Sequence, residues 1–328
     1  MNYTPHPSIE VQDSTKQNEY MTCPRLNFLE HVLGWRKVGA GFHLDYGSAF
    51  HEGLAMLYNC LKEDGCYTPG GVLQAQAAFD TAYKAAFGGE AVMGVYNDPN
   101  CATAKNLTNG MLAIEEYAKR YSSDRLFSVE HVETVGTIPI DVDRRLFFRL
   151  DTVLQRKSGR YMIMEHKTAS QDNSSAQAHW PLAFQIGTYN HVLYMMYGDA
   201  AEGVEADIII LRKKGNEFRR VPCWIQPDRM QDWLERANHY MSLFLQDLDI
   251  FVKWANTDGC VEETTMPCFH KRTTSCLNYG ECSFMNFCLS YHNPLKATRS
   301  VEPPAGYVKQ FWDPREMESK EGTKVVTL

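Results

Sequence analysis

Several features that define other classes of protein are missing from this chain of 328 residues. It has no run of about 18 apolar residues, so no transmembrane helix is expected. The first residues, MNYTPHPSIEVQDSTKQNEY, are polar and lack the apolar stretch of a secretory signal, which predicts a cytoplasmic protein. Thiols stay reduced in that compartment, so the ten cysteines are first interpreted as free, metal-bound or catalytic.

Other absences concern partners and cofactors. No G-x-x-x-x-G-K-[ST] motif occurs, so the chain carries no ATP-binding loop of that type, and a helicase or recombinase partner would be another chain. The chain also lacks a net positive charge, because its formal net charge is -7. That total argues against a protein that coats nucleic acid, but it leaves room for an enzyme that binds DNA through a local basic patch.

The hydrophobic content of 44% is enough for one large domain, or for one domain with an added lobe. We expect a mobile N-terminal arm, a folded domain with a helical insertion and a cysteine-rich segment, and a loosely docked tail. The predicted ranges are 1–21 for the arm, 22–290 for the domain, about 65–122 for the insertion, about 268–290 for the cysteine-rich segment and 291–328 for the tail.

Hydrophobic periodicity predicts the order helix, three strands, helix, strand in the core. The expected helices are residues 23–35, 46–61, 181–198 and 227–254, and the expected strands are 127–138, 145–154, 160–166 and 206–214, the last paired with 217–225 in a hairpin. This order predicts an α/β fold with a central mixed sheet flanked by helices.

Two neighbouring strands of this core carry charged residues in the stretch RLDTVLQRKSGRYMIMEHKTA. If residues 157–159 form a three-residue hairpin loop with Gly159 in the left-handed conformation, Asp151 falls opposite Glu165. Partners across two strands have Cβ atoms about 4.5–5.5 Å apart, so their like charges require a cation between them. Lys167 shares a strand face with Glu165 and projects beside the same point.

These residues are the parts needed to hydrolyse a phosphodiester. A divalent metal would polarise the phosphate and activate water, while the lysine would stabilise the attacking water and the developing charge. The competing interpretation is an ordinary exposed acid pair on a hairpin. His51 on an earlier helix is a further candidate ligand, although a lone histidine is usually a packed or surface residue. Gln185 and Tyr189, four apart on a later helix, share a face and could contact the phosphate or the lysine.

A basic patch lies in LRKKGNEFRR, which has five cations and one acid. It is either a nucleic-acid-binding surface or an ordinary solvated hairpin. Its candidate contacts are Arg212, Lys213, Lys214, Arg219 and Arg220.

The motifs in their order along the chain resemble the RecB-like branch of the PD-(D/E)xK nuclease superfamily. The order is G-x-x-x-H at Gly47 and His51, then Asp151, then E-x-K at Glu165 and Lys167, and finally Q-x-x-x-Y at Gln185 and Tyr189. The resemblance implies a restriction-endonuclease-like core. It implies metal ligation by Asp151, Glu165, His51 and the backbone carbonyl of His166, with Lys167 as the catalytic lysine. A histidine among oxygen ligands favours Mn²⁺ at least as much as Mg²⁺.

The cysteines near the end of the chain form a second candidate site. Cys276, Cys282 and Cys288 are spaced by equal six-residue steps, and Cys23 lies alone before the first helix of the core. Four thiolates can hold zinc or a [4Fe–4S] cluster, but the C-x₂₋₄-C knuckles usual for zinc are absent. Three buried thiols acting as small hydrophobic residues remain the simpler alternative.

The same resemblance favours the cluster. The nuclease domain of the AddAB helicase–nuclease and the CRISPR-adaptation nucleases are similar in having one cysteine before the nuclease core and three after it, which hold [4Fe–4S]. Cys268 is the alternative to Cys276 as a ligand.

We therefore expect a Mg²⁺- or Mn²⁺-dependent DNA nuclease, with an exonuclease acting on ends or single strands favoured. Recombination, repair and phage replication are the expected processes. One alternative is a non-catalytic iron–sulfur protein that binds nucleic acid or assists assembly. A second is an iron–sulfur electron carrier, in which the acids would be incidental.

Overall fold

The computed structural model describes residues 3–39, 41–88, 104–123, 127–171, 178–278, 281–319 and 323–328. These residues fall into two compact units. The cysteine unit comprises residues 1–40, 137–148 and 231–319, and the sheet unit comprises 41–136, 149–230 and 320–328. The chain alternates between the units, whereas the sequence predicted consecutive ranges. Part of the expected helical insertion, residues 89–103, lies outside the described residues.

A six-stranded sheet is the centre of the sheet unit, with the strand order β6-β5-β4-β3-β2-β8. The strands are β2 (Phe127–Pro139), β3 (Arg145–Arg156), β4 (Tyr161–Ala169), β5 (Ala201–Ile210), β6 (Glu217–Trp224) and β8 (Lys324–Thr327). β4 and β5 are parallel, whereas the β3–β4 and β5–β6 pairs are antiparallel. The mixed sheet predicted from the sequence is therefore confirmed.

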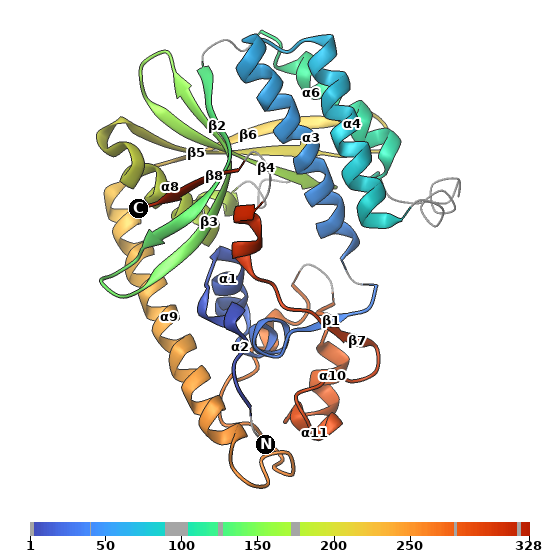
Figure 1. Ribbon diagram of the computed structural model, residues 1–328, viewed down its shortest axis with the longest axis vertical. Coiled ribbons are helices and arrows are strands. Elements are labelled where there is room, and N and C mark those ends of the chain that lie inside the picture. The colour runs from blue at the N-terminus through green and yellow to red at the C-terminus, as the bar shows by residue number, and fades with distance from the viewer. Residues whose placement is uncertain are drawn as a thin grey trace. The chain divides into compact units, whose positions relative to one another are not determined.

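Helices cover both faces of this sheet (Figure 1). On one face lie α3 (Phe42–Asp64), α4 (Pro69–Phe87) and α6 (Leu107–Arg120), and on the other lies α8 (Phe184–Tyr197), with short 3₁₀ turns η3 (Trp180–Leu182) and η4 (Gly198–Ala200) at its ends. Parallel strands need a long crossover, which α8 provides between β4 and β5. A core of apolar side chains joins α3, α4 and α6 to β4 through Met162 and Met164.

The β3–β4 hairpin has the geometry predicted from its sequence. Gln155 pairs with Tyr161 and Thr152 with Met164. The loop closes through a hydrogen bond from the Arg156 amide to the Arg160 carbonyl (2.8 Å), and Gly159 has φ +83°. A positive φ costs glycine little, and this allows the three-residue turn that fixes the register of the two strands.

The cysteine unit is mainly helical. Its elements are η1 (Pro7–Glu10), α1 (Ser14–Thr22), α2 (Pro24–Asn27), the π-helical turn η2 (Phe28–Val32), β1 (Trp35–Lys37), η5 (Thr273–Ser275), α10 (Met285–Ser290), α11 (Leu295–Thr298), β7 (Tyr307–Lys309) and η6 (Pro314–Ser319), together with α9 (Pro227–Ala255) from residue 231 onward. β1 and β7 form a two-stranded antiparallel sheet. Aromatic side chains dominate its core, including Phe28, Phe251 and Phe269.

The segments expected to be a mobile arm and a loosely docked tail contain buried residues and regular elements among the described residues. Tyr20 of α1 is 4% exposed, and its hydroxyl donates to Asp247 at 2.8 Å. Lys16 is also buried, and its ammonium is satisfied by hydrogen bonds to the carbonyls of Ser8 and Val11. The polar composition of the arm concealed this internal hydrogen bonding. In the tail, Leu295 is fully buried and two strands, β7 and β8, are formed.

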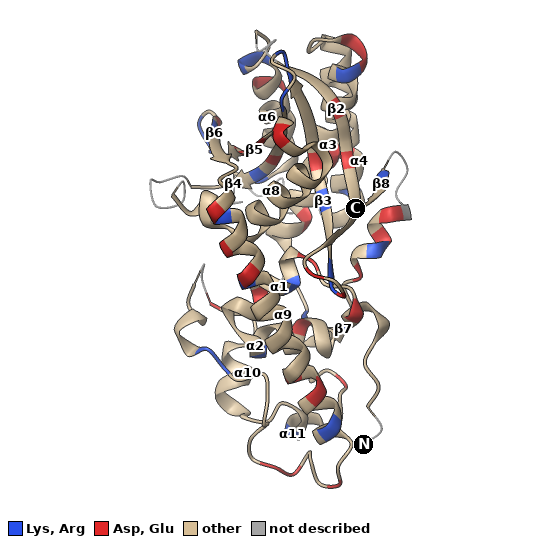
Figure 2. Cartoon of the chain, turned by 90° about the vertical axis from the view of Figure 1, so that its left-hand side faces the viewer, with Lys and Arg blue, Asp and Glu red and all other residues tan. Residues whose placement is uncertain are grey.

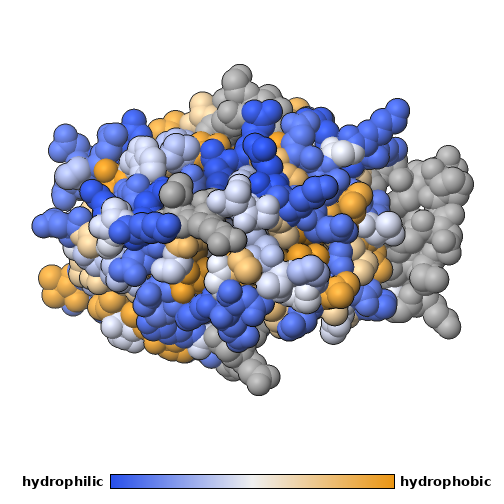
Figure 3. Space-filling model, turned by 90° about the horizontal axis from the view of Figure 1, so that it is seen from above, coloured by the Kyte–Doolittle hydropathy of each residue, from blue (hydrophilic) through white to orange (hydrophobic). Residues whose placement is uncertain are grey.

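None of the described helices is both long and apolar enough to cross a membrane. Hydrophilic side chains cover much of the face shown in Figure 3, and hydrophobic side chains are scattered between them.

Candidate metal and catalytic site

The candidate site begins where the β3–β4 ladder ends. Thr152 and Met164 are the last paired residues, so Asp151 and Glu165 are the next residues along the two strands. The amide of His166 donates to Asp151 Oδ2 at 2.8 Å, so a carboxylate takes the role that a backbone carbonyl has within a ladder. Asp151 and Glu165 are 4% and 1% exposed. The structure thus places two carboxylates in the interior, whereas an ordinary hairpin acid pair would be solvated.

His51 of α3 reaches the same point from the helical face. Its Nδ1 lies 3.2 Å from Asp151 Oδ1. Burial opposes the charged form of the imidazole, but the Asp151 carboxylate outweighs burial and raises the pKa of His51. Burial likewise opposes ionisation of Asp151, and His51 together with the neighbouring cations keeps the pKa of that carboxyl below its usual range. Asp151 is therefore held as an anion.

Glu165 and Lys167 form an ion pair on the same strand, with Lys167 Nζ 2.6 Å from Glu165 Oε1. Burial and the charge of Asp151 raise the pKa of Glu165. For Lys167, burial opposes the charge, but Glu165 and Asp151 prevail and raise the pKa. The second oxygen of Glu165, Oε2, is buried and has no hydrogen-bond partner among the described residues. An unsatisfied carboxylate oxygen of this kind fits the role of a cation ligand.

Gln185 and Tyr189 of α8 lie near the two carboxylates, whose charges act on Tyr189. Gln185 Nε2 donates to the Tyr189 hydroxyl at 2.7 Å, and Tyr189 is 4% exposed. Burial, followed by the charges of Glu165 and Asp151, raises the pKa of the Tyr189 phenol, so its hydroxyl stays protonated. The hydroxyl is consequently able to donate a hydrogen bond.

Arg149, on the same strand face as Asp151, is a cation of the site whose role the sequence did not reveal. Its Nε lies 3.4 Å from Glu133 Oε2 on β2, and its charge interacts with those of Asp151 and Glu165. Glu133 has φ +50°, which is uncommon for a residue other than glycine. The position of Arg149 two residues before Asp151 was the signal that could have found it.

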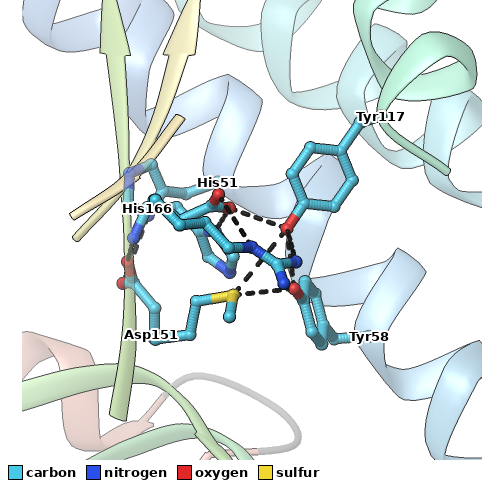
Figure 4. A network of polar contacts seen from close by, with 8 residues as sticks. His51, Tyr58, Tyr117, Asp151 and His166 are labelled. Atoms are coloured by element: carbon cyan, nitrogen blue, oxygen red, sulfur yellow. Dashed lines mark hydrogen bonds and ion pairs between the residues drawn. The ribbon is translucent and has the colours of Figure 1, made fainter. Parts of the chain in front are cut away.

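The opposite face of β4 carries a buried polar network (Figure 4). His166 Nδ1 lies 2.8 Å from Asp207 Oδ2 on β5, and the Tyr117 hydroxyl donates to the same oxygen at 2.7 Å. Arg220 joins this network through Asp207, and its guanidinium lies 3.7 Å from the centre of the Tyr121 ring. Sequence reasoning assigned Arg220 to nucleic-acid binding, which these interior contacts contradict. An acid within the apolar run ADIIIL was the available signal, because a buried charge needs partners.

The other members of the basic patch lie on the β5–β6 hairpin (Figure 2). Arg212 and Arg219 pair with Glu217, at 2.7 Å and 3.5 Å. Lys213 and Lys214 are exposed at the turn.

The four candidate cluster cysteines all belong to the cysteine unit. The Cys282 amide donates to the Cys276 carbonyl at 2.9 Å, and the thiol of Cys282 interacts electrostatically with those of Cys276 and Cys23. The thiol of Cys288 interacts with those of Cys282 and Cys23. The structure thus brings Cys23 close to three cysteines that lie more than 250 residues later in the chain. Cys268 is fully buried, and Asp247 and Arg25 are its charged neighbours.

One group of metal-ligand type occurs elsewhere in the described residues of the cysteine unit. Ligand atoms of Glu19, Glu30 and His31 lie within 4.8 Å of one another. Arg36 already pairs with Glu30 at 2.7 Å, and His31 Nε2 lies 2.7 Å from Glu19 Oε2. Because Arg36 compensates Glu30 and burial raises the pKa of Glu19 to about 7, we interpret the group as a structural polar cluster.

Three comparisons with known proteins test which protein family the chain belongs to. The search of curated proteins gives no match. Among solved structures, the chain is similar to one titled "Crystal structure of SSO0001", with 13% sequence identity over 51% of this chain and 70% of that chain. The TM-score is 0.26, which is too low to support an argument.

The model of the PD-(D/E)XK nuclease superfamily matches residues 14–288, which include every predicted site residue. Together with the six-stranded mixed sheet and its flanking helices, this match identifies the fold as restriction-endonuclease-like. The chain belongs to the PD-(D/E)XK nuclease superfamily.

Proposed function

We propose that the protein is a DNA nuclease that uses Mn²⁺ or Mg²⁺, held by His51, Asp151, Glu165 and the backbone carbonyl of His166. The observation that carries the proposal is the buried pair of carboxylates with an unsatisfied oxygen, Glu165 Oε2. His51 and Lys167 each contact one oxygen of this pair, but two buried carboxylates side by side still repel each other, and a divalent ion with oxygen and imidazole ligands would compensate them.

The backbone of His166 supports its part in this ligand set. Its amide donates toward β3, to Asp151 Oδ2. The amide and carbonyl of one strand residue point toward the same side of the strand, because a hydrogen-bonded pair exchanges both bonds. The carbonyl of His166 therefore faces the side where Asp151 lies.

Each remaining residue has a role that follows from its contacts. When bound, the metal supplies charge stabilisation to the scissile phosphate and lowers the pKa of a water. Lys167, held by Glu165, orients the attacking water and donates to the developing negative charge. The protonated hydroxyl of Tyr189, oriented by Gln185, donates to a phosphate oxygen. Arg149 adds positive charge beside the carboxylates.

We favour an exonuclease that acts on DNA ends or single strands, in recombination, repair or phage replication in the cytoplasm, with a helicase or recombinase as a separate partner. The four remaining cations of the β5–β6 hairpin would contact phosphates. Arg212 and Arg219 pair with Glu217, whereas Lys213 and Lys214 are exposed at the turn, so we assign these two lysines the main contacts to DNA.

We also propose that Cys23, Cys276, Cys282 and Cys288 hold a [4Fe–4S] cluster. Their electrostatic proximity supports this set, and Cys268 fits it less well because the Asp247 carboxylate beside it disfavours a thiolate. These thiols do not form a group within 4.8 Å of one another among the described residues. A tetrahedral zinc site, with Zn–S bonds of about 2.3 Å, requires closer thiols than a cube of four irons does. The cluster would be a structural link within the cysteine unit.

The alternative function is a non-catalytic iron–sulfur protein that binds nucleic acid. It would retain DNA without cleaving it in any metal. The complete set of Asp151, Glu165 and Lys167 beside the unsatisfied oxygen favours the enzyme.

A cleavage assay tests the proposal. Purified protein is incubated with end-labelled single- and double-stranded DNA in Mn²⁺, Mg²⁺, Ca²⁺ or chelator. We expect cleavage in Mn²⁺ and Mg²⁺, with mononucleotides or short products released from ends. Lys167→Ala should abolish cleavage, while Lys157→Ala, which removes an exposed lysine from the hairpin turn, should leave it unchanged.

Equal cleavage by Lys167→Ala and wild type would refute the assigned site. DNA retention without cleavage in every metal would favour the non-catalytic alternative. Internal nicking of circular DNA would replace the exonuclease proposal with an endonuclease.

A further inference from the structure

The buried network behind β4 has no direct part in the function proposed above. His166 is 2% exposed, and its side chain points to the opposite sheet face from those of Glu165 and Lys167. Its direct partner across the parallel β4–β5 ladder is Asp207, which is fully buried. The two side chains meet at 2.8 Å, from Nδ1 to Oδ2. A buried carboxylate accepts hydrogen bonds, so the proton of His166 is assigned to Nδ1.

Asp207 is itself fixed by groups from two other elements. The Tyr117 hydroxyl of α6 donates to Oδ2 at 2.7 Å, and Arg220 Nε of β6 lies 3.4 Å from Oδ1. Arg220 also donates to the Tyr117 hydroxyl at 3.3 Å, which closes a ring of three groups. Burial opposes ionisation of Asp207, but the hydrogen bond from His166 and the charge of Arg220 lower its pKa. Both oxygens of the carboxylate are thus occupied, and its orientation is fixed.

His166 is consequently held on two sides (Figure 4). Its ring is tied to β5 through Asp207, while its amide is tied to Asp151 at 2.8 Å. Rotation of the ring would disturb β4 at the point where the β3–β4 ladder has ended and where the strand is paired with β5 alone. The same peptide segment carries the carbonyl assigned to the metal and leads directly to Lys167.

We propose that Asp207, Tyr117 and Arg220 are positioning residues that set the metal affinity of the site by fixing His166, and through its amide the Asp151 carboxylate. The inference rests on the proposed metal site. The network contacts neither substrate nor metal, and acts only through the geometry of His166. Groups that orient metal ligands in this way typically change metal affinity or activity by about 10–100-fold when they are mutated.

The test compares two tyrosines of the same core. Tyr117 and Tyr58 are both fully buried, and their hydroxyls lie 2.7 Å apart, but Tyr117 is the one that bonds Asp207. Tyr117→Phe and Asp207→Asn are measured against Tyr58→Phe in the full chain. Mn²⁺ binding is measured without DNA by titration calorimetry, with Asp151→Asn defining the signal of the proposed site. The half-saturating Mn²⁺ concentration for cleavage and the melting temperature are measured in parallel.

We expect Asp207→Asn to weaken Mn²⁺ binding by about 10–100-fold and to raise the half-saturating Mn²⁺ concentration by the same factor. Tyr117→Phe should produce a smaller shift in the same direction, and Tyr58→Phe a change of less than about threefold, even where the two tyrosine variants lose similar melting temperature. If Asp207→Asn does not fold, the difference in Mn²⁺ affinity between Tyr117→Phe and Tyr58→Phe decides whether the network positions His166.

Wild-type Mn²⁺ affinity in a folded Asp207→Asn protein, or equal shifts in the two tyrosine variants, would overturn the positioning role. Failure of the proposed function gives a different result. Wild-type protein that binds Mn²⁺ at the Asp151-dependent site but cleaves no DNA would remove the nuclease proposal, while the affinity comparison would still decide the role of the network.

Discussion

The two candidate metal centres are supported in different ways. In the sheet unit, the carboxylates and their partners lie on β3, β4, α3 and α8, and hydrogen bonds or ion pairs hold most of them. In the cysteine unit, the three late cysteines lie among short elements, η5 and the six-residue α10, with turns between them. If both proposed groups bind, the divalent ion would occupy a scaffold that is already formed in the sheet unit, whereas the cluster would itself be part of the scaffold of the cysteine unit.

The largest expected effect is on catalysis in the sheet unit. Asp151→Asn keeps the size of the side chain and a hydrogen-bond acceptor for the His166 amide, but removes a charge from the proposed metal ligands. We expect cleavage to fall by about 10³-fold, since metal-assisted charge stabilisation contributes several kcal/mol. The melting temperature should change by less than about 5 °C. Initial rates and thermal unfolding measure the two effects.

Chelation gives an independent control for the same contrast. EDTA should stop cleavage, and Mn²⁺ should restore it, without a loss of tertiary structure in near-ultraviolet circular dichroism. Unfolding of the protein by EDTA alone would show that the carboxylate site also depends on its ion for stability, and the contrast between the centres would disappear.

In the cysteine unit we expect stability to respond instead. Cys288→Ser should remove bound iron and visible absorbance, and should lower the melting temperature by on the order of 10 °C, because a tightly bound group stabilises the native state by several kcal/mol. Cys66→Ser, at a half-buried cysteine of the sheet unit, is the matched control and should change neither quantity. Iron analysis and absorbance spectra measure whether each variant still holds the cluster. Iron content unaffected by Cys288→Ser would exclude this ligand set.

A smaller effect is expected at the β5–β6 hairpin, where the charges act through solvent. Replacing both Lys213 and Lys214 by alanine should weaken single-stranded DNA binding, and the slope of log affinity against log salt should fall by about 1.4, or about 0.7 for each lost phosphate contact. The double replacement of Lys119 and Arg120, exposed at the end of α6, is the control. Binding isotherms at four salt concentrations measure the slope, and an unchanged slope would remove the hairpin from the DNA path.

The smallest effect concerns the turn that sets the register of the carboxylate strands. Gly159→Ala places a side chain in open space but at φ +83°, so only backbone strain is added. We expect destabilisation by about 1 kcal/mol, with cleavage nearly unchanged, because the turn lies at the opposite end of the hairpin from Asp151. Ser158→Ala is the control for this turn. Denaturant unfolding measures the difference, and a large loss of cleavage would mean that the register depends on more than this turn.

Local patterns were sufficient to predict much of the sheet unit. The three-residue turn with Gly159, the strand periodicity around Asp151 and Glu165, and the spacing of Gln185 and Tyr189 are all short-range properties. The buried network was missed because Tyr117, Asp207 and Arg220 come from three elements whose contacts no local period encodes. Arg220 was assigned to DNA because a run of cations in sequence does not reveal which side chain turns inward.

The cysteine unit was harder to predict for a related reason. The spacing of Cys276, Cys282 and Cys288 predicted that these residues act together, but not the helix of residues 14–22 or the two-stranded sheet of β1 and β7. Both depend on partners more than 200 residues away, such as Asp247 for Tyr20 and Lys309 for Trp35. Polar residues that satisfy one another inside a core look the same in sequence as residues that face water.

The last strand has a consequence for handling the protein. β8 lies next to β2 at one margin of the large sheet, and Lys324 contacts His131 there. Removal of residues 320–328 would expose the backbone amides and carbonyls of the part of β2 that lies beside β8. An exposed edge strand of this kind can pair with strands of other molecules. A shortened protein should therefore associate with itself as its concentration rises, and a purification tag is better attached at the other terminus.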